Sequence, residues 1–247
     1  MKLLCLDIGN TSITICDYKN EKLGEITRVA SDENFINQLT KYNLGSFDYI
    51  ILCSVVPNLT KLLINYCKNH SINIYEINYK NSHLNLHVDN PSEVGNDRIC
   101  NAIAAKKLNF NPSIIIDFGT ATTFDVINKD GAYIGGVICP GINLSLQTLH
   151  KAAARLPRVA VAKPDKVIGT TTVSAMTSGI YHGYIGLIKN IVELITLELK
   201  YKTKIILTGG LADLFSKNLG INNIIKKNLT IEGLYLAYKN AKLKKND

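Results

Sequence analysis

A short phrase that occurs twice constrains this chain more than any other feature of its 247 residues. Asp7-Ile8-Gly9-Asn10-Thr11 ends the apolar run 2–6, and Asp117-Phe118-Gly119-Thr120-Ala121 ends the apolar run 114–116. Each copy predicts a buried strand ending in a carboxylate, then a glycine turn, then a second strand. The copies start 117 − 7 = 110 residues apart, which is about the length of one domain, so the pattern predicts two similar halves.

The residue types of the repeated phrase suit phosphate binding. Glycine lets the backbone N–H groups approach a phosphate closely, and hydroxyl and amide side chains donate further hydrogen bonds. A carboxylate at the end of the strand can serve Mg²⁺, which usually keeps several of its waters. A single copy is better explained as a simple hairpin turn, because Gly, Asn and Asp favour turns for steric reasons. Two copies in equivalent positions favour a nucleotide site gripped from both halves.

The periodicity predicts the same order of three strands followed by alternating helices and strands in each half. The predicted strands are 2–7, 12–18, 22–29, 48–53, 72–77, 113–117, 121–127, 131–138 and 204–208. The predicted helices are 33–43, 58–69, one from Glu93 onward, 142–155, 172–200, a short one from Leu211, and 231–244. The polar break Asn109–Pro112 is the expected joint, which gives domains 1–112 and 113–247.

Composition narrows the class of protein without deciding its function. No run of residues is apolar for long enough to span a bilayer, and Met1-Lys2 leads straight into a strand, so we expect a cytoplasmic protein without a signal peptide. The six cysteines are widely spaced in apolar runs, as expected of small buried side chains. The formal charge of +8 is diffuse and lacks interleaved aromatic residues, so nucleic acid is an unlikely partner.

Six sequence blocks narrow the interpretation further. They are Asp7-x-Gly-Asn-Thr, Glu93-Val-Gly-Asn-Asp-Arg98, Asp117-x-Gly-Thr-Ala-Thr-Thr-Phe-Asp125, Gly135-Gly-x-Ile-x-Pro-Gly141, Ile168-Gly-x-x-Thr-Val-x-x-Met-x-Ser-Gly179 and Leu207-Thr-Gly-Gly210. In this order and at these distances, the series resembles the type III pantothenate kinases, which catalyse the first step of coenzyme A synthesis. The resemblance implies an α/β fold of two tandem ribonuclease H-like domains of the actin-like ATPase kind. Each would have a mixed five-stranded sheet with flanking helices, and a cleft would lie between them.

The resemblance also implies which residues bind ATP. The first turn would hold the β- and γ-phosphates through Asp7, Ile8, Gly9, Asn10, Thr11, Ser12, Ile13 and Thr14. Asp7 would reach Mg²⁺ through water, and Thr120 would be the leading donor of the second turn. Asp117 would bind a monovalent cation, K⁺ or NH₄⁺. Gly209 and Gly210 would meet the adenosine.

The acceptor implied by the resemblance is pantothenate, a primary alcohol that also carries a carboxylate. Asp97 is the candidate catalytic base, and the adjacent guanidinium of Arg98 is a planar fork suited to a carboxylate. Without the resemblance, the same pair is explained as charges at the start of a helix. The substrate residues implied are Val88, Gly95, Asn96, Asp97, Arg98 and Thr172, with Thr172 acting across the interface of a homodimer.

Three positions depart from the usual pattern of the family. Asn96 stands where Ala is common, Val88 stands where a Tyr is frequent, and Thr170-Thr171 replace a Lys-Asn pair. These departures concern the shape of the substrate pocket, because every residue assigned to the chemistry is present. They leave open a kinase for another small hydroxyl compound, or a non-enzymatic relative of these kinases that assists transcription.

Overall fold

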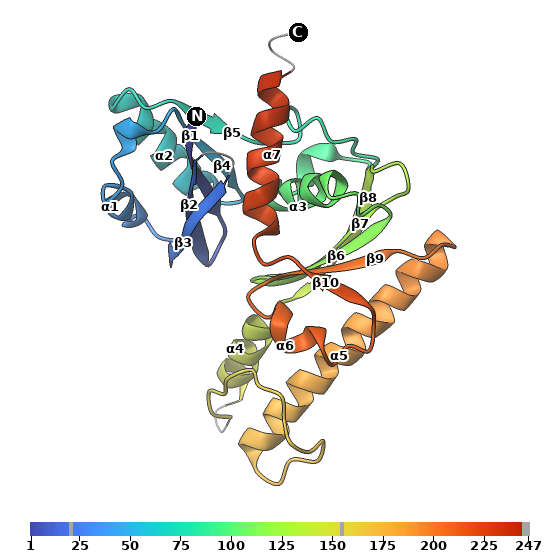
Figure 1. Ribbon diagram of the computed structural model, residues 1–247. Coiled ribbons are helices and arrows are strands. Elements are labelled where there is room, and N and C mark those ends of the chain that lie inside the picture. The colour runs from blue at the N-terminus through green and yellow to red at the C-terminus, as the bar shows by residue number, and fades with distance from the viewer. Residues whose placement is uncertain (20–21, 154–155, 244–247) are drawn as a thin grey trace. The chain divides into compact units, whose positions relative to one another are not determined.

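The computed structural model describes residues 1–19, 22–153 and 156–243. The chain forms two compact units (Figure 1). One unit contains residues 1–109 together with the segment from Asn228 onward, and the other contains Phe110–Lys227. No helix among the described residues is long and apolar enough to cross a lipid bilayer.

The first unit is built on a mixed sheet in the order β3-β2-β1-β4-β5. Its strands are β1 (Lys2–Ile8), β2 (Ser12–Lys19), β3 (Lys22–Ala30), β4 (Tyr49–Ser54) and β5 (Ile74–Glu76). β1 pairs antiparallel with β2 and parallel with β4, so the carboxyl ends of β1 and β4 lie side by side. The residues of β1 and β4 are apolar at nearly every position because both faces of the sheet are covered.

Helices cover both faces of this sheet. On one face, α1 (Phe35–Leu39) and α2 (Pro57–Asn69) pack on Leu4, Leu6 and Ile8. On the other face pack α3 (Asn96–Lys107) and α7 (Leu229–Leu243), and Figure 1 shows α7 as the red helix. Short 3-10 turns occur at Leu44–Ser46 and Pro91–Glu93.

The second unit repeats the same sheet. Its order is β10-β9-β6-β7-β8, with β6 (Ser113–Phe118) paired antiparallel with β7 (Ala121–Ile127) and parallel with β9 (Lys204–Gly209). β8 (Tyr133–Pro140) and β10 (Asn223–Ile225) form its edges. β6 therefore takes the place of β1, and each copy of the repeated phrase ends the central strand of its own sheet.

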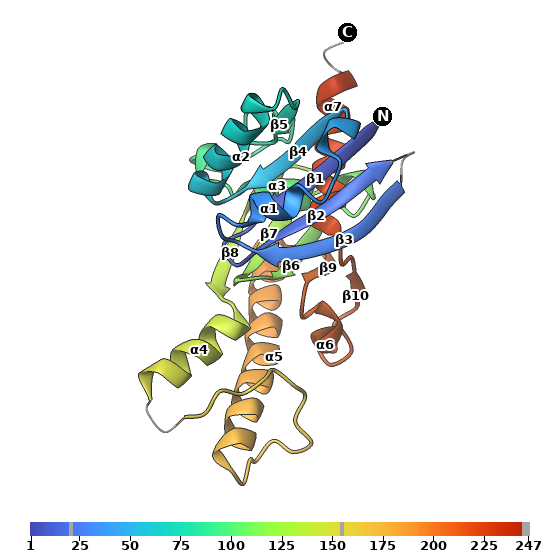
Figure 2. The same cartoon turned by 90° about the vertical axis from the view of Figure 1, so that its left-hand side faces the viewer.

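The core of the second unit lies between its sheet and three helices. These are α4 (Ile142–Ala152), α5 (Thr172–Leu199) and α6 (Ala212–Ser216), which pack on Ile114, Ile116 and Phe124. Figure 2 shows α5 as the long helix of this unit, with α4 beside its N-terminal part. The hydroxyl of Ser145 on α4 lies 3.0 Å from that of Tyr184 on α5, which ties the two helices together.

The predicted elements are confirmed with shifted ends, with three exceptions. The helix expected at 33–43 is only Phe35–Leu39, and Glu93 lies in a 3-10 turn before α3, because Val94 and Gly95 have extended ψ angles. β10 was not predicted, because three residues are too few to show a period. Residues 154, 155 and 244 of two predicted helices lie outside the described residues.

The predicted domains 1–112 and 113–247 differ from the observed units at their ends. The chain divides between Asn109 and Phe110, and α7 belongs with the first unit. The reason is close packing between α7 and α3: Gly233 approaches the carbonyl of Cys100 so tightly that a side chain would overlap it. Tyr235 of α7 also stacks on Tyr18 with ring centroids 3.7 Å apart, and Thr230 donates to Asn101 at 2.9 Å.

Candidate active site

The first strand-end loop connects β1 to β2 and is held by its own backbone and by the end of β3. The Gly9 N–H donates to the Ser12 carbonyl at 3.1 Å, which closes the turn. Ser31, the residue after β3, donates its hydroxyl to the Gly9 carbonyl at 2.5 Å and its N–H to the Thr11 carbonyl at 3.3 Å. Asn10 and Thr11 at the tip are exposed, so the loop presents polar groups from a fixed backbone.

The eight predicted residues of this loop divide by burial. The side chains of Ile8 and Ile13 are fully buried in the core, so these two residues can offer a ligand only backbone groups. Thr14 is also buried and pairs with Asp7 across the strands. The residues that can face a ligand with side chains are therefore the half-buried Asp7 and Ser12 and the exposed tip.

Asp7 lies beside the end of β4. In the parallel pair its partner is Cys53, whose thiol donates to Asp7 Oδ1 at 3.5 Å. A hydrogen bond with Cys100, burial, and the charges of Asp7 and Asp97 together raise the pKa of Cys53 well above its ordinary value. This thiol thus lies near both carboxylates that the sequence assigned to phosphate and acceptor chemistry.

The second strand-end loop connects β6 to β7 and is held by backbone hydrogen bonds. The Gly119 N–H donates to the Ala121 carbonyl at 3.1 Å, and the Gly141 N–H donates to the Thr120 carbonyl at 3.1 Å. Gly141 follows β8 as Ser31 follows β3. A Cβ at Gly141 would overlap the Thr120 carbonyl and lie 2.7 Å from that of Gly119, so only glycine fits there.

Gly209 lies directly beside Asp117. The residues at these strand ends pair as Asp117 with Thr208 and Phe118 with Gly209. Gly209 has a φ of +85°, and a Cβ there would lie 2.6 Å from Asp117 Oδ1 and 2.7 Å from the Phe118 backbone. The missing side chain leaves a carboxylate and a carbonyl together at the ends of two strands, a set of oxygen ligands that suits a cation.

The loop expected to bind the acceptor forms the start of α3. Gly95 is the N-cap, and Asn96, Asp97 and Arg98 form the first turn of the helix. Asp97 Oδ1 accepts the Arg98 N–H at 2.8 Å, and a Cβ at Gly95 would come within 2.5 Å of that oxygen. Glycine at 95 therefore lets the carboxylate fold back over the helix N-terminus.

Burial raises the pKa of the Asp97 carboxyl, and the Arg98 N–H and guanidinium partly oppose the shift. A half-buried carboxylate with a raised pKa accepts a proton more readily than an exposed one. The raised pKa makes the Asp97 carboxylate a stronger base than an ordinary exposed one.

Two predicted substrate residues lie elsewhere. Val88 is half-buried in the segment before the turn Pro91–Glu93. Thr172 begins α5, where the cap is Thr171, which exchanges hydrogen bonds with Ser174. Within the described residues the Thr172 hydroxyl makes no hydrogen bond, so capping does not occupy it.

The model of the type III pantothenate kinase family matches residues 3–194. A type III pantothenate kinase of Dehalococcoides mccartyi is 41% identical over 96% of this chain and 97% of its own length. One from Paramagnetospirillum magneticum is 42% identical, covering 94% and 95% respectively. This chain belongs to the type III pantothenate kinase family.

Solved structures show the same fold at lower identity. Ethanolamine utilization protein EutJ of Carboxydothermus hydrogenoformans has a TM-score of 0.55 at 14% identity, covering 96% of this chain and 89% of its own. Component A of the (R)-2-hydroxyglutaryl-CoA dehydratase of Acidaminococcus fermentans has a TM-score of 0.52 at 12% identity, covering 98% and 99%. The predicted fold class, with mixed five-stranded sheets of the actin-like ATPase kind, is confirmed for this pantothenate kinase family member.

Sequence reasoning missed the residues that support the site. Ser31 and Cys53 carry no motif of their own, and their contacts with the first loop follow only from strand pairing. Gly141 was named only as the last residue of one sequence block. Its close approach to the second loop could have been suspected from its place after the third strand, which matches that of Ser31.

Proposed function

We propose that this protein transfers the γ-phosphoryl group of ATP to the primary hydroxyl of pantothenate in the cytoplasm, giving 4′-phosphopantothenate for coenzyme A synthesis. The proposal rests on two side chains in the first turn of α3, in a chain that belongs to this family. There, a carboxyl with a raised pKa and a guanidinium stand side by side.

Asp97 is the proposed general base. Its carboxylate takes the hydroxyl proton as the oxygen forms a bond to the γ-phosphorus, and the bond from that phosphorus to the β–γ bridging oxygen breaks to release ADP. Arg98 is proposed to bind the carboxylate of pantothenate, since a guanidinium offers parallel donors to two carboxylate oxygens. Gly95 keeps the space that the Asp97 carboxylate needs.

Each strand-end loop is proposed to bind ATP phosphates. The first would use the backbone of residues 8–11 and the hydroxyl of Ser12, and the second would use Thr120. Gly209 and Gly210 would contact the adenosine. Mg²⁺ would neutralise the phosphates and reach Asp7 through water. The described ranges contain no cluster of three or more His, Cys, Asp or Glu suited to a metal. The proposed Mg²⁺ would therefore take most of its ligands from phosphate and water.

A monovalent cation is proposed at Asp117. The support is the fit of its oxygen ligands: Gly209 lacks the side chain that would otherwise fill the space beside the Asp117 carboxylate and the Phe118 carbonyl. K⁺ or NH₄⁺ there would offset the negative charge close to the proposed phosphate site.

A homodimer is proposed on the second unit. Large apolar side chains are exposed before α5 and along it, namely Val167, Ile168, Val173, Leu194 and Leu197. The first three lie just before or at the N-terminal end of α5 and the last two near its C-terminal end, and exposed apolar side chains of this size favour an interface. The free hydroxyl of Thr172 would then contact the pantothenate of the partner subunit, and light scattering on the purified protein measures the oligomeric state.

The proposal is tested by a coupled assay with ATP, Mg²⁺ and pantothenate, in K⁺, NH₄⁺ or Na⁺. We expect turnover, faster in K⁺ or NH₄⁺ than in Na⁺. If pantothenate is not phosphorylated in any of these salts, a panel of other small alcohols tests a changed acceptor. Salt-sensitive DNA binding without any kinase activity would favour the accessory regulator instead.

A further inference from the structure

We infer that Asn96 is a positioning residue, which sets the catalytic carboxylate of Asp97 against the first phosphate loop through the end of β4. The inference rests on the proposed function and concerns a residue that departs from the common Ala of the family pattern.

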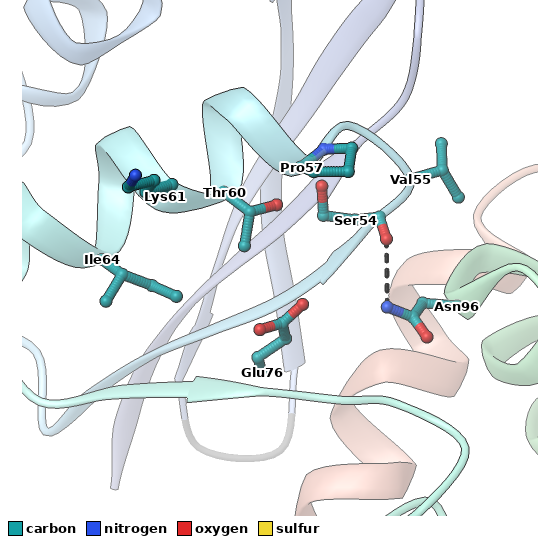
Figure 3. Close-up of a pocket in the computed structure, with 8 residues that line it drawn as sticks. All are labelled: Ser54, Val55, Pro57, Thr60, Lys61, Ile64, Glu76 and Asn96. Carbon is teal, nitrogen blue, oxygen red and sulfur yellow. Dashed lines mark hydrogen bonds between the residues drawn. The ribbon is translucent and has the colours of Figure 1, made fainter. Parts of the chain in front are cut away.

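The observation is a hydrogen bond between distant segments. Asn96 is the first residue of α3, and its Nδ2 donates to the carbonyl of Ser54, the last residue of β4, at 3.0 Å. Figure 3 shows this bond at the wall of a pocket, with Asn96 reaching from the helix toward the strand end. Ser54 itself is buried, so the acceptor belongs to the rigid part of the sheet.

A second hydrogen bond connects the residue after β4 to the start of the first loop. Val55 donates its N–H to the Ile8 carbonyl at 3.1 Å, and Ile8 immediately precedes Gly9 of the loop. Two hydrogen bonds and short stretches of backbone therefore connect the base to the phosphate loop, all within the first unit.

Among the described residues, the Asp97 carboxylate accepts hydrogen bonds from its own helix, from the N–H groups of Asp97 and Arg98. They orient the carboxylate on α3 but do not place α3 relative to β1. The Asn96 bond supplies that placement at the residue adjacent to the base. Phosphoryl transfer depends on the reacting groups being held to a fraction of an ångström, and a shift of about 1 Å can cost about 100-fold in rate.

A pocket beside this bond makes it possible to distinguish an effect of Asn96 on catalysis from an effect on stability. It encloses about 420 Å³ and is lined by Thr60 and Ile64 of α2, Glu76 of β5, and the Asn96–Ser54 pair. Water in this pocket can solvate the Ser54 carbonyl when the amide is removed. The urea midpoint of unfolding should then shift only slightly, because a hydrogen bond to water replaces the one that is lost.

The test is steady-state kinetics of the full-length chain with ATP and pantothenate, alongside urea unfolding. The variants are Asn96→Ala, which removes the amide, and Asn96→Asp, which keeps its shape but cannot donate when ionised. The matched control is Asn73→Ala. Asn73 donates from Nδ2 to the Asp48 carbonyl at 3.2 Å, at the opposite end of the same strand β4.

We expect both Asn96 variants to lower kcat about 10- to 100-fold, with KM for ATP within a factor of about 2, and Asn73→Ala to leave both constants unchanged. Full kcat in Asn96→Ala would overturn the inference. So would full kcat in Asn96→Asp, which would assign a space-filling role, or a loss of kcat fully explained by unfolding. Absence of turnover in the unmodified protein would instead contradict the proposed function.

Discussion

The two strand-end loops occupy equivalent places in two sheets of the same order, yet they are held in different ways. In the first loop, the side-chain hydroxyl of Ser31 donates a hydrogen bond to the Gly9 carbonyl. In the second, Gly141 brings its backbone so close to Thr120 and Gly119 that no side chain fits. We therefore expect the first loop to tolerate the loss of one hydrogen bond, and the second loop not to tolerate an added atom at Gly141.

The surroundings of the loops differ as well. By chain order, the helix after β5 is α3 and the helix after β10 is α7, so these two are equivalent elements of the repeat. Only α3 begins with Gly95, Asn96, Asp97 and Arg98, whereas α7 begins with the apolar Leu229 and packs on α3. The proposed base thus belongs to one copy alone, while the proposed cation belongs to the other.

The largest effect is expected from Asp97→Asn. The amide cannot take the hydroxyl proton, so kcat should fall by about 10²- to 10⁴-fold with the fold intact. Asp130→Asn, which changes an exposed carboxylate in the turn between β7 and β8, serves as the control and should keep full activity. If the Asp97→Asn variant turned over at the normal rate, Asp97 would not be the base, and the proposed difference between the two copies of the repeat would be wrong.

Asp97→Asn should also stabilise the protein at neutral pH. Burial raises the pKa of this carboxyl in the folded state, so folding costs free energy whenever the group is ionised. That cost is fully present above the raised pKa and disappears as the pH falls through it and below the ordinary carboxyl value. Urea unfolding of both proteins at pH 7 and at low pH should show a gain that vanishes in acid; an equal gain at both pH values would contradict this origin.

A smaller effect, on stability and on ATP binding, is expected from Gly141→Ala. The backbone angles at this position suit alanine, so the cost comes from overlap with the Thr120 carbonyl, about 1–3 kcal/mol as in other overpacked sites. KM for ATP should rise because the second loop must move. Gly45→Ala, where a Cβ meets only an ordinary contact at 3.9 Å, is the control. An unchanged KM and Tm in Gly141→Ala would show that the two loops are equally tolerant.

The smallest effect is expected from Ser31→Ala. The variant loses the hydroxyl bond to Gly9 but keeps the backbone bond to Thr11, so the free energy of unfolding should fall by about 1 kcal/mol. KM for ATP should rise by less than in Gly141→Ala. Ser46→Ala removes a similar bond to the Asn43 carbonyl away from the loop and should leave KM unchanged. A larger loss in Ser31→Ala than in Gly141→Ala would reverse the comparison.

Much of the fold could be predicted because its signals are local. Apolar runs ending in Asp7 and Asp117 marked the central strands, and the helix predicted from Glu93 onward is present with its start at Asn96. The place of α7 could not be predicted this way. Its pairing with α3 depends on the contact between Gly233 and Cys100, which are far apart in the sequence.

The supporting contacts of the site were hidden for the same reason. The bonds from Ser31 to Gly9, Cys53 to Asp7 and Asn96 to Ser54 each join segments at least 22 residues apart. Strand pairing and helix docking create them, and no local pattern of residue types records either. Motifs therefore indicated candidate residues for the chemistry, and only the fold shows what holds those residues.

The division of roles between Asp97 and Asp117 is tested most directly by the rate of pantothenate phosphorylation as a function of K⁺, with Na⁺ replacing it at constant ionic strength. The unmodified protein should be stimulated by K⁺. Asp117→Asn should lose that response, and Asp97→Asn should be slower by orders of magnitude at every K⁺ concentration. Contradiction would come from an Asp117→Asn variant that responds to K⁺ like the unmodified protein, or from an unmodified protein that does not phosphorylate pantothenate.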